Sequence, residues 1–517
     1  MPEWLGNAIF YEIYPQSFYD ANRDGIGDIA GMRQKLPYIQ QLGANAIWIN
    51  PIFDSPFLDA GYDVRDYKRV ALRYGTNEEL IEFFAEARKL GIHVILDLVP
   101  GHTSYEHEWF RESSKADKND MSGRYIWTNS VWEAPPSYKF VCGMAERDGN
   151  YLVNFFSSQP ALNYGFHEIT EPWQKPADHP DAVRTKQAIM DVMAFWLDAG
   201  CDGFRVDMAD SLVKNDEEKT ATQRIWRDIR SMLEKKYPEA ALISEWSCPQ
   251  RAIPCGFHAD FYLDHVGKGY HHIFREIDAE TKSPIGFFSA SGREDFSQFA
   301  GEFSADYARV AEQGYISLIS GNHDTPRLRH FMNPEEMKLA FAFLLTMPGV
   351  PFIYYGDEIG MRYLPDLRSK EGGYQRTGTR TPMQWDDSPN KGFSTADPSQ
   401  LYLPVDSSHD APTVTSQESD PESLLSIVRE LCALRRREQE LSGNGSFRFL
   451  TVPKHGEPLV YQRGDLLVAI NPSLEASSCR MPVDSGPIYH IGEIPVCQDG
   501  SLRFAAQSFA VYRLCRS

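Results

Sequence analysis

The sequence has no long apolar segment. No stretch of 18 or more apolar residues occurs in its 517 residues, and a membrane-spanning helix requires about that length. The first residues, MPEWLGNAIFYEIYPQSF, also lack a basic region followed by an apolar run, which is the pattern of a secretory signal. We therefore expect neither secretion nor membrane insertion, and we predict a cytoplasmic protein.

Basic residues are too few to balance the acidic ones. Lys and Arg together number 52 against 72 Asp and Glu, which gives a formal net charge of -20. Such a charge repels polyphosphate backbones and anionic membrane surfaces, so nucleic acid and membranes are poor candidates for partners. An uncharged small-molecule substrate fits this balance better.

Cysteine is sparse as well. Eight cysteines, at 142, 201, 248, 255, 432, 479, 497 and 515, are scattered without the close spacing typical of a zinc site. We expect reduced thiols. With 42% hydrophobic and 24% charged residues, the composition is that of a globular protein, and the length predicts two or three domains.

Short apolar runs and helical patterns alternate along most of the chain. Eight runs predict strands, at 7–14, 45–50, 93–100, 201–207, 241–246, 258–264, 316–324 and 350–358. Between them lie stretches such as 76–91 and 184–200, whose apolar residues recur every three or four positions and which end in glycine. This alternation predicts an α/β fold, a (β/α)8 TIM barrel whose active site lies at the carboxyl ends of the strands.

Other regions do not follow this alternation. The segment after the third strand is too long for one helix and predicts an inserted domain at 104–174. The stretch 361–420, rich in Pro, Ser and Asp, predicts loops over the mouth of the barrel. Short strand-like runs near the end predict a C-terminal all-β sandwich at 441–517. The catalytic barrel would then comprise 1–103 and 175–440.

Charged and polar residues stand at the carboxyl ends of four predicted strands. They are Asp97 and His102 on the third, Arg205 and Asp207 on the fourth, Glu245 on the fifth, and His323 and Asp324 on the seventh. A single carboxylate is more often part of a surface ion pair than of a catalytic site. Several at the one face where a barrel places its active site predict carboxylate chemistry.

The motifs around these residues resemble a known family. DLVPGH at 97–102, GFRVD at 203–207, SEW at 244–246 and GNHD at 321–324 look like the four ordered regions of the α-amylase superfamily, glycoside hydrolase family 13. QPALN at 159–163, GYD at 61–63 and MPGVPFIYYGDE at 347–358 agree with this. The resemblance covers roughly residues 7–400 and implies an enzyme that acts on α-glucosidic bonds.

Cleavage with retention needs two carboxyl groups about 5 Å apart, one ionised and one protonated. The resemblance implies that Asp207 is the nucleophile, kept ionised by Arg205, and that Glu245 is the general acid and then the base. It also implies a set of residues that bind the sugar ring through hydrogen bonds or stacking: Asp324, His102, His323 and Tyr62.

Two further segments resemble the oligo-1,6-glucosidase and α-glucosidase branch more than the endo-acting amylases. They are SPFLDAGYDVRDY at 55–67 and RTPMQWDDSPNKGF at 380–393. In that branch a pair matching Asp63 and Arg380 closes the site behind the terminal glucose, which implies exo-action. Arg327 and Tyr164 are expected to shape the acceptor side. Met208 is neither the Val nor the smaller residue that the branch places after the nucleophile for 1,6- and 1,4-bonds, so the linkage stays open.

The leading hypothesis is therefore a retaining, exo-acting α-glucosidase that hydrolyses short oligosaccharides or disaccharides through a covalent glycosyl-Asp intermediate. An α-glucosyltransferase or isomerase, similar to trehalose synthases or sucrose isomerases, would use the same site. An endo-acting α-amylase and a catalytically silent binding protein are further alternatives. The oligomeric state stays open.

One loop has the spacing of a cation site. DANRDGIGD at 20–28 repeats the D-x-[ND]-x-D-G pattern that wraps oxygen ligands around Ca²⁺. The predicted ligands are Asp20, Asn22, Asp24, the Ile26 carbonyl and Asp28. The loop also matches the position of the family's own ion-binding loop, and a structural Ca²⁺ is the expectation, with Mg²⁺ as the alternative. Gly101 replaces the Asn that ligates a second calcium in amylases, so that second site is not expected.

Overall fold

Eight parallel strands form the centre of the computed structural model, which describes residues 1–454, 456–481 and 486–514. The strand order is β11-β10-β9-β8-β5-β2-β1-β12. A parallel bridge between Ile319 and Phe352 joins the two edges, so the sheet closes into a barrel. The predicted α/β barrel is confirmed. Of the eight cysteines, Cys515 lies outside the described residues.

The barrel strands are shorter than the apolar runs that predicted them. Their bounds are β1 Phe10–Ile13, β2 Ala46–Ile49, β5 His93–Leu98, β8 Gly203–Val206, β9 Ala241–Ser244, β10 Ala259–Tyr262, β11 Tyr315–Leu318 and β12 Phe352–Tyr354. Every residue of β1, β2 and β8 is buried. Because β11 ends at Leu318, His323 and Asp324 lie in the loop that follows the strand and not on the strand itself.

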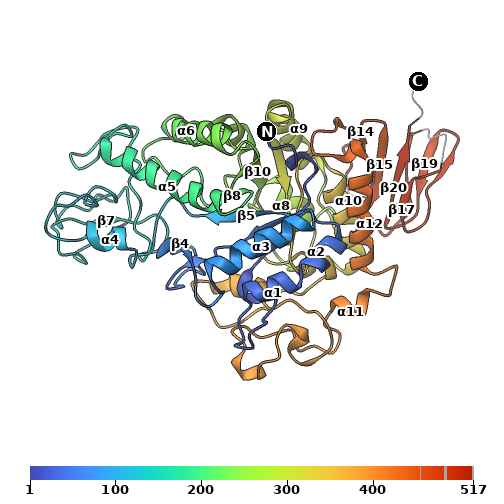
Figure 1. Cartoon of the computed structure of the whole chain (residues 1–517). Helices are drawn as coiled ribbons and strands as arrows, with labels where there is room; N and C mark the ends of the chain where they lie inside the picture. The colour runs from blue at the N-terminus through green and yellow to red at the C-terminus, as the bar shows by residue number, and fades with distance from the viewer. Residues whose placement is uncertain (455, 482–485, 515–517) are drawn as a thin grey trace.

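Helices surround the barrel (Figure 1). The longer ones are α2 Leu36–Leu42, α3 Asn77–Lys89, α5 Pro180–Asp198, α6 Thr220–Lys236, α9 Ser297–Val310, α10 Pro334–Thr346 and α12 Leu424–Arg437. Shorter ones are α1 Ile29–Gln34, α7 Pro249–Ala252, α8 Gly269–Phe274 and α11 Val414–Gln417. Thr76 and Glu79 form a capping box that fixes the start of α3 close to the predicted residue. Helix α5 begins earlier than predicted, because His179 caps it and Pro180 occupies its first position.

The segment between β5 and α5 contains little regular structure. It holds α4 Glu108–Ser113 and the short strand pair β6 Phe140–Val141 and β7 Tyr151–Leu152. Its own small core consists of Ile126, Leu152, Ala161, Phe166 and Trp173. Another hairpin, β3 Phe53–Asp54 with β4 Asp66–Val70, precedes α3. Figure 1 shows α4 and β7 at the end of the molecule opposite the C-terminal strands.

The C-terminal region consists of two antiparallel sheets. Their strands are β13 Phe447–Phe449, β14 Leu459–Arg463, β15 Leu466–Asn471, β20 Ser508–Arg513 and β17 Tyr489–Ile491 in one, and β16 Ser477–Cys479, β19 Ser501–Phe504 and β18 Val496–Gln498 in the other. Residues of both sheets share a core that includes Val460, Leu467, Leu502 and Phe504. The predicted all-β C-terminal region is confirmed.

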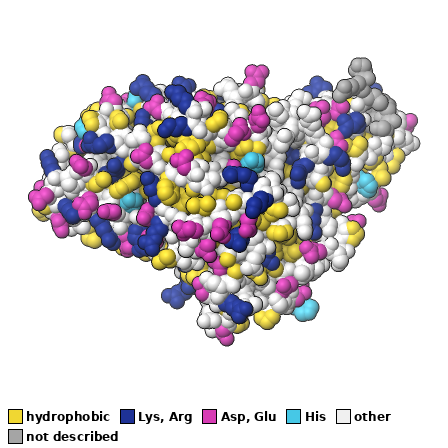
Figure 2. Space-filling model, in the orientation of Figure 1, with side chains coloured by type: hydrophobic (Ala, Val, Ile, Leu, Met, Phe, Trp, Pro, Cys, Tyr) yellow, Lys and Arg dark blue, Asp and Glu magenta, His cyan; other side chains and the backbone are white. Residues whose placement is uncertain are grey.

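The surface mixes charges of both signs. On the face drawn in Figure 2, basic and acidic side chains are interspersed with apolar ones, without a large area of a single sign. Within the described part of the chain, no helix is both long enough and apolar enough to cross a membrane.

Candidate active site

A cavity of about 390 Å³ lies at the carboxyl ends of the barrel strands. The residues directly after β8 and β9 contribute Asp207 and Glu245 to its wall, and the loop after β11 contributes Asp324. His102 and Tyr62 line it too. The barrel thus brings these five predicted residues together, since parallel neighbouring strands end at the same face.

One guanidinium joins the two predicted catalytic carboxylates. Arg205 is 1% exposed, and its Nη1 lies 2.8 Å from Asp97 Oδ1 and 3.1 Å from Asp207 Oδ1. Its Nη2 lies 2.8 Å from Glu245 Oε1. The side chains of Asp207 and Glu245 keep 10% and 17% of their surface exposed. Both carboxyl groups are therefore held by the same cation and still face the cavity.

The protonation of this pair follows from its burial. Burial raises the pKa of Asp207 to about 7, although Arg205 opposes the shift. Burial likewise raises the pKa of Glu245 to about 7, again against Arg205. Two neighbouring carboxyl groups of this kind titrate as a pair, because ionisation of one disfavours ionisation of the other. Near neutral pH the pair can hold one proton, which gives one ionised and one protonated carboxyl group.

A buried chain of hydrogen bonds leads from Asp97, which also contacts Arg205, to His323 and Glu12. Tyr62 Oη lies 3.0 Å from Asp97 Oδ2 and 2.7 Å from His323 Nε2, and the two rings are stacked. His323 Nδ1 lies 2.9 Å from Glu12 Oε1, and Asn50 Nδ2 donates to the same oxygen at 3.1 Å. Burial lowers the pKa of His323 to about 3, so the ring is neutral at pH 7. His323 does not line the cavity. It contacts Tyr62 and Asp324, which do line it.

His102 has a defined tautomer. Its Nε2 lies 3.1 Å from the Tyr62 carbonyl, which only accepts, so Nε2 carries the proton. Its Nδ1 accepts from Asn154 Nδ2 at 3.2 Å. Burial lowers the pKa of His102 to about 4, so this ring is neutral as well.

An ammonium group connects the inserted segment to the barrel beside His102. Lys214 Nζ donates to Asn154 Oδ1 at 2.9 Å and also to the Ser211 carbonyl. A Cβ at Gly101 would lie 2.8 Å from Asn154 Nδ2 and 3.2 Å from Ser211 Oγ, so a larger residue there would displace this contact. Burial lowers the pKa of Lys214 to about 8, and Lys219 acts in the same direction.

Two arginines close one side of the cavity around Asp324. Arg376 Nη1 and Arg380 Nη2 lie 2.9 Å and 2.8 Å from Asp324 Oδ1. Arg376 Nη2 also lies 3.5 Å from Asp59 Oδ1, and Gln159 Nε2 donates to Asp59 Oδ2 at 2.7 Å. Burial alone would raise the pKa of Asp324, but its interactions with His323, Arg380 and Arg376 hold it well below the usual range. Asp324 is therefore ionised and oriented.

The expected pair of Asp63 with Arg380 does not form. Asp63 is fully buried, and its carboxylate accepts from Ser55 Oγ and from the backbone N–H groups of Leu58 and Asp59. Asp63 therefore stabilises the turn that precedes it in the chain. Arg380 instead donates to Asp324 and to the His323 carbonyl at 2.8 Å. The carboxylate that forms an ion pair with an arginine of the 361–420 stretch is Asp59, four residues before Asp63, and its partner is Arg376.

Neither residue expected on the acceptor side reaches the cavity. Arg327 is completely buried, lies 3.1 Å from Asp357 Oδ1 and donates to the Tyr355 carbonyl at 2.7 Å. Tyr164 is buried and donates to the Pro100 carbonyl at 2.8 Å. Both side chains are held inside the protein, Arg327 through Nη1 on a carboxylate and a backbone carbonyl and Tyr164 through its hydroxyl on a backbone carbonyl.

The side chains of the predicted calcium loop accept hydrogen bonds from the backbone. Asp20 accepts from Arg23 and Gly25, Asn22 from Asp24, and Asp24 from the Ile26 N–H. Asp28 accepts from Gly31 at the start of α1. No group of three or more His, Cys, Asp or Glu side chains within the described residues could hold a metal ion. A cation site in this loop remains a prediction.

Several lining residues were missed from the sequence. They are Asp59, Phe155, Asp210, Trp246, Leu263, His265 and Arg376. Glu12 was missed too, although an acidic residue inside an otherwise apolar predicted strand was a visible signal. Arg376 carried no such signal, because its loop has no regular pattern.

Known proteins match most of the chain. Residues 12–444 match the model of the α-amylase catalytic domain. The chain is 31% identical to an oligo-1,6-glucosidase of Heyndrickxia coagulans, over 94% of this chain and 95% of that protein. It is 30% identical to the trehalose synthase/amylase TreS of Mycolicibacterium smegmatis, over 97% and 89% respectively.

Solved structures show the same fold. A variant of isomaltulose synthase from Erwinia rhapontici NX5 in complex with D-glucose is 25% identical and covers 99% of both chains, with a TM-score of 0.81. An α-glucosyl transfer enzyme, XgtA, has a TM-score of 0.80 at 25% identity and also covers 99% of each chain. The family model spans well over half of the sequence, and the chain belongs to the α-amylase family, glycoside hydrolase family 13, as an enzyme of the oligo-1,6-glucosidase and α-glucosidase branch.

Proposed function

We propose that the protein is a retaining, exo-acting α-glucosidase that hydrolyses short oligosaccharides or disaccharides. The observation that carries the proposal is the pair of cavity-facing carboxyl groups, Asp207 and Glu245, held by the single guanidinium of Arg205. Retaining hydrolysis needs such a pair, one member ionised and the other protonated.

In the first step, a carboxylate oxygen of Asp207 attacks the anomeric carbon of the terminal glucose. The bond from that carbon to the glycosidic oxygen breaks, and the leaving oxygen takes the proton of Glu245. Arg205 contacts both groups, so its charge favours the ionised Asp207 before attack and the ionised Glu245 after it. The products are a glucosyl-Asp207 ester and a free leaving group.

In the second step, Glu245 acts as the base. It removes a proton from a water molecule, whose oxygen attacks the anomeric carbon and displaces Asp207. The carbon is inverted twice, so the released glucose keeps the α configuration. Asp324 is oriented by two arginines to accept hydrogen bonds from ring hydroxyls, and these bonds strengthen as the sugar flattens in the transition state.

Exo-action is supported by the closed side of the cavity. Arg376 joins Asp324 to Asp59, and Gln159 of the inserted segment also binds Asp59. A polysaccharide running through the site would have to break these contacts. A terminal glucose would only have to fit in front of them.

Transfer to a sugar acceptor is the second candidate. The relatives include a trehalose synthase/amylase and an α-glucosyl transfer enzyme. The same glucosyl-Asp207 ester would serve either outcome, and the acceptor that reaches it decides between them.

Product analysis tests the proposal. The purified protein is incubated with maltose, isomaltose, kojibiose, nigerose, trehalose, sucrose, maltotetraose and soluble starch, and products are followed over time with Asp207→Asn as the control. Release of α-glucose from short substrates, absent in the variant, is the expected result. New disaccharides would favour transfer, and activity on starch alone would contradict the exo-acting pocket.

A further inference from the structure

A buried carboxylate lies beside the strand that leads to Glu245. Asp260, the second residue of β10, is completely buried and pairs in register with Ser244, the last residue of β9. Successive side chains of a strand point to opposite faces, so Ser244 and Asp260 share one face and Glu245 follows on the other. Asp260 accordingly does not line the catalytic cavity, whereas Glu245 does.

The Asp260 carboxylate accepts hydrogen bonds from both sides of Glu245. Its Oδ1 accepts from Ser244 Oγ at 2.6 Å and from the Trp246 N–H at 3.1 Å. Its Oδ2 accepts from the Cys248 N–H at 2.7 Å. The residues immediately before and after Glu245 are therefore bonded to the same carboxylate oxygen.

The loop after β9 contains a residue with a strained backbone. Ser247 has φ 57°, in the left-handed region that residues with a side chain seldom adopt. Such a conformation persists where the surrounding contacts determine it. Asp260 bonds the residues on either side, Trp246 and Cys248, and Ser247 Oγ accepts from the Leu263 N–H at 3.1 Å. Because Trp246 and Leu263 line the catalytic cavity, the loop that Asp260 holds forms part of its wall.

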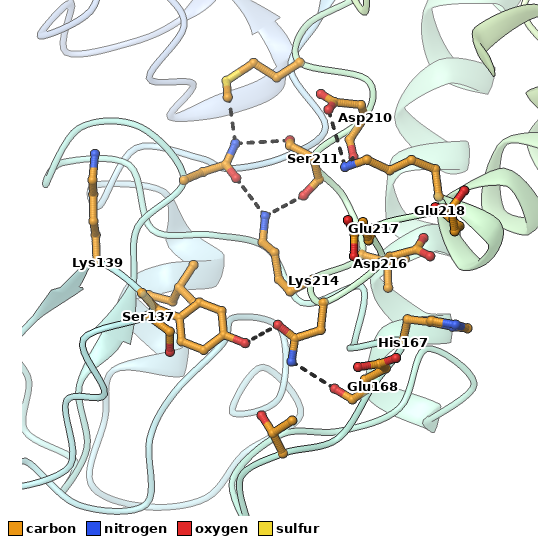
Figure 3. Close-up of a pocket in the computed structure, with 18 of the residues that line it drawn as sticks. Ser137, Lys139, His167, Glu168, Asp210, Ser211, Lys214, Asp216, Glu217 and Glu218 are labelled. Carbon is orange, nitrogen blue, oxygen red and sulfur yellow. Dashed lines mark hydrogen bonds and ion pairs between the residues drawn. The ribbon is translucent and has the colours of Figure 1, made fainter. Parts of the chain in front are cut away.

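A second loop contacts Glu245 as well. The Met208 N–H, in the turn after β8, donates to Glu245 Oε2 at 3.0 Å. Figure 3 shows how this stretch continues past Ser211 to Lys214, whose ammonium donates to the Ser211 carbonyl and to Asn154 of the inserted segment. Glu245 is thus fixed between two loops, one anchored by an ammonium group and the other by a buried carboxylate.

The three hydrogen bonds require a carboxylate at position 260. Each partner donates, which favours the ionised form. Burial raises the pKa of Asp260 to about 7, and the bonds from Ser244, Cys248 and Trp246 oppose this shift. An amide would keep the shape, but its NH2 group would face a backbone N–H whichever way it were turned, because each oxygen accepts from one. Asp260→Asn would therefore break at least one bond that holds the loop.

We infer that Asp260 is a positioning residue for the acid–base step: its carboxylate sets the direction in which Glu245 presents its carboxyl group to the glycosidic oxygen. This inference rests on the proposed function and deepens it, because it names the residue that orients the general acid. A general acid must lie within hydrogen-bond reach of the atom that takes its proton, and it contributes about 10²–10⁴-fold to the rate. A displaced Glu245 should therefore slow the departure of poor leaving groups and spare those that leave without a proton.

The test compares two leaving groups. We measure kcat/KM for α-glucosyl fluoride and for the disaccharide that the wild type cleaves fastest in the product analysis. Fluoride is a weakly basic anion that needs little protonation, whereas a sugar leaving group needs a full proton. Both substrates share the glucose unit, so the ratio of the two kcat/KM values isolates the contribution of the general acid.

Four proteins are compared: the wild type, Asp260→Asn, Ser244→Ala and Asp202→Asn. Asp202 provides the matched control, because its Oδ2 also accepts from a backbone N–H of the barrel, that of Val94 at 2.9 Å, but it lies just before β8, at the amino end of that strand. Ser244→Ala removes only the hydroxyl that donates to Asp260.

Asp260→Asn should lower kcat/KM at least ~10-fold for the disaccharide and less than ~3-fold for α-glucosyl fluoride. Ser244→Ala should shift the ratio of the two values in the same direction by at least ~3-fold. Asp202→Asn should leave the ratio within ~2-fold of the wild type, because the general acid keeps its place.

An equal loss on both substrates in Asp260→Asn, or no loss on either, would overturn the inference. A change of the ratio in Asp202→Asn as large as that in Asp260→Asn would overturn it too. If Asp260→Asn does not fold, an unchanged ratio in Ser244→Ala would do so. Failure of the proposed function would look different, because the wild type would then release glucose from none of the disaccharides.

Discussion

Arg205 should be the most consequential single residue for the acid–base state of the site. Arg205→Met removes the charge and keeps an unbranched side chain of similar reach. It leaves Asp97, Asp207 and Glu245 without the cation that all three contact between 2.8 and 3.1 Å. The side chains of these carboxylates are at most 17% exposed, so water cannot replace the lost partner well.

The size of the effect can be worked out from the ion pairs. Removal of one partner from a buried ion pair costs about 3–5 kcal/mol. One pKa unit corresponds to about 1.36 kcal/mol, so the three carboxylates together would shift upward by roughly 2–4 units. The pKa of Asp207, already raised to about 7 by burial, would then lie above neutrality. Most molecules would carry a protonated nucleophile at pH 7.

The assay is kcat/KM against pH for the wild type and Arg205→Met. At pH 7 the variant should lose at least ~100-fold in kcat/KM, and the acidic limb of its profile should move up by at least ~1 pH unit. Activity should partly return as the pH rises above the new pKa. A loss of equal size at every pH, with no shift of the limb, would refute the reasoning. Arg33→Met, which breaks exposed pairs with Glu82 and Glu86, serves as the control and should change kcat/KM less than ~2-fold.

The remaining predictions concern three other parts of the molecule. Burial raises the pKa of Glu12 well above its usual value, so the native state keeps this proton to a higher pH than the unfolded chain does. The stability that this difference contributes is lost as pH rises through the folded pKa. Glu12→Gln should remove that loss, so its urea unfolding free energy should exceed that of the wild type at alkaline pH and not at acidic pH. Arg376→Ala opens the closed side of the cavity, so the ratio of starch cleavage to disaccharide cleavage should increase at least ~5-fold, and an unchanged ratio would argue against closure by this residue. If the 20–28 loop binds Ca²⁺, excess EDTA should lower Tm by at least ~2 °C and added Ca²⁺ should restore it, whereas Asp24→Ala should show no response to either. An EDTA effect of the same size in the variant would place the ion elsewhere.

The sequence by itself determined the barrel and the chemistry of its face. Strand and helix periodicity are local properties, so eight alternating units could be found without knowing any long-range contact. The positions of Asp207 and Glu245 followed from the same pattern, because each directly follows its strand, whereas Asp324 lies in the loop after β11. Family motifs added their roles.

Only the tertiary structure decided how these groups are paired. Arg376, which follows β12 in the chain, forms an ion pair with Asp59, which precedes β4. Gln159 of the inserted segment donates a hydrogen bond to the same carboxylate. The sequence instead suggested Asp63 and Arg380, yet Asp63 is used by its own turn and Arg380 by Asp324. Met208 and Asp210 line both the catalytic cavity and a neighbouring cavity of about 920 Å³, and this arrangement likewise depends on how the inserted segment packs on the stretch between β8 and α6. Loop conformations of this kind follow from contacts between distant residues, which leave no periodic signal in the sequence.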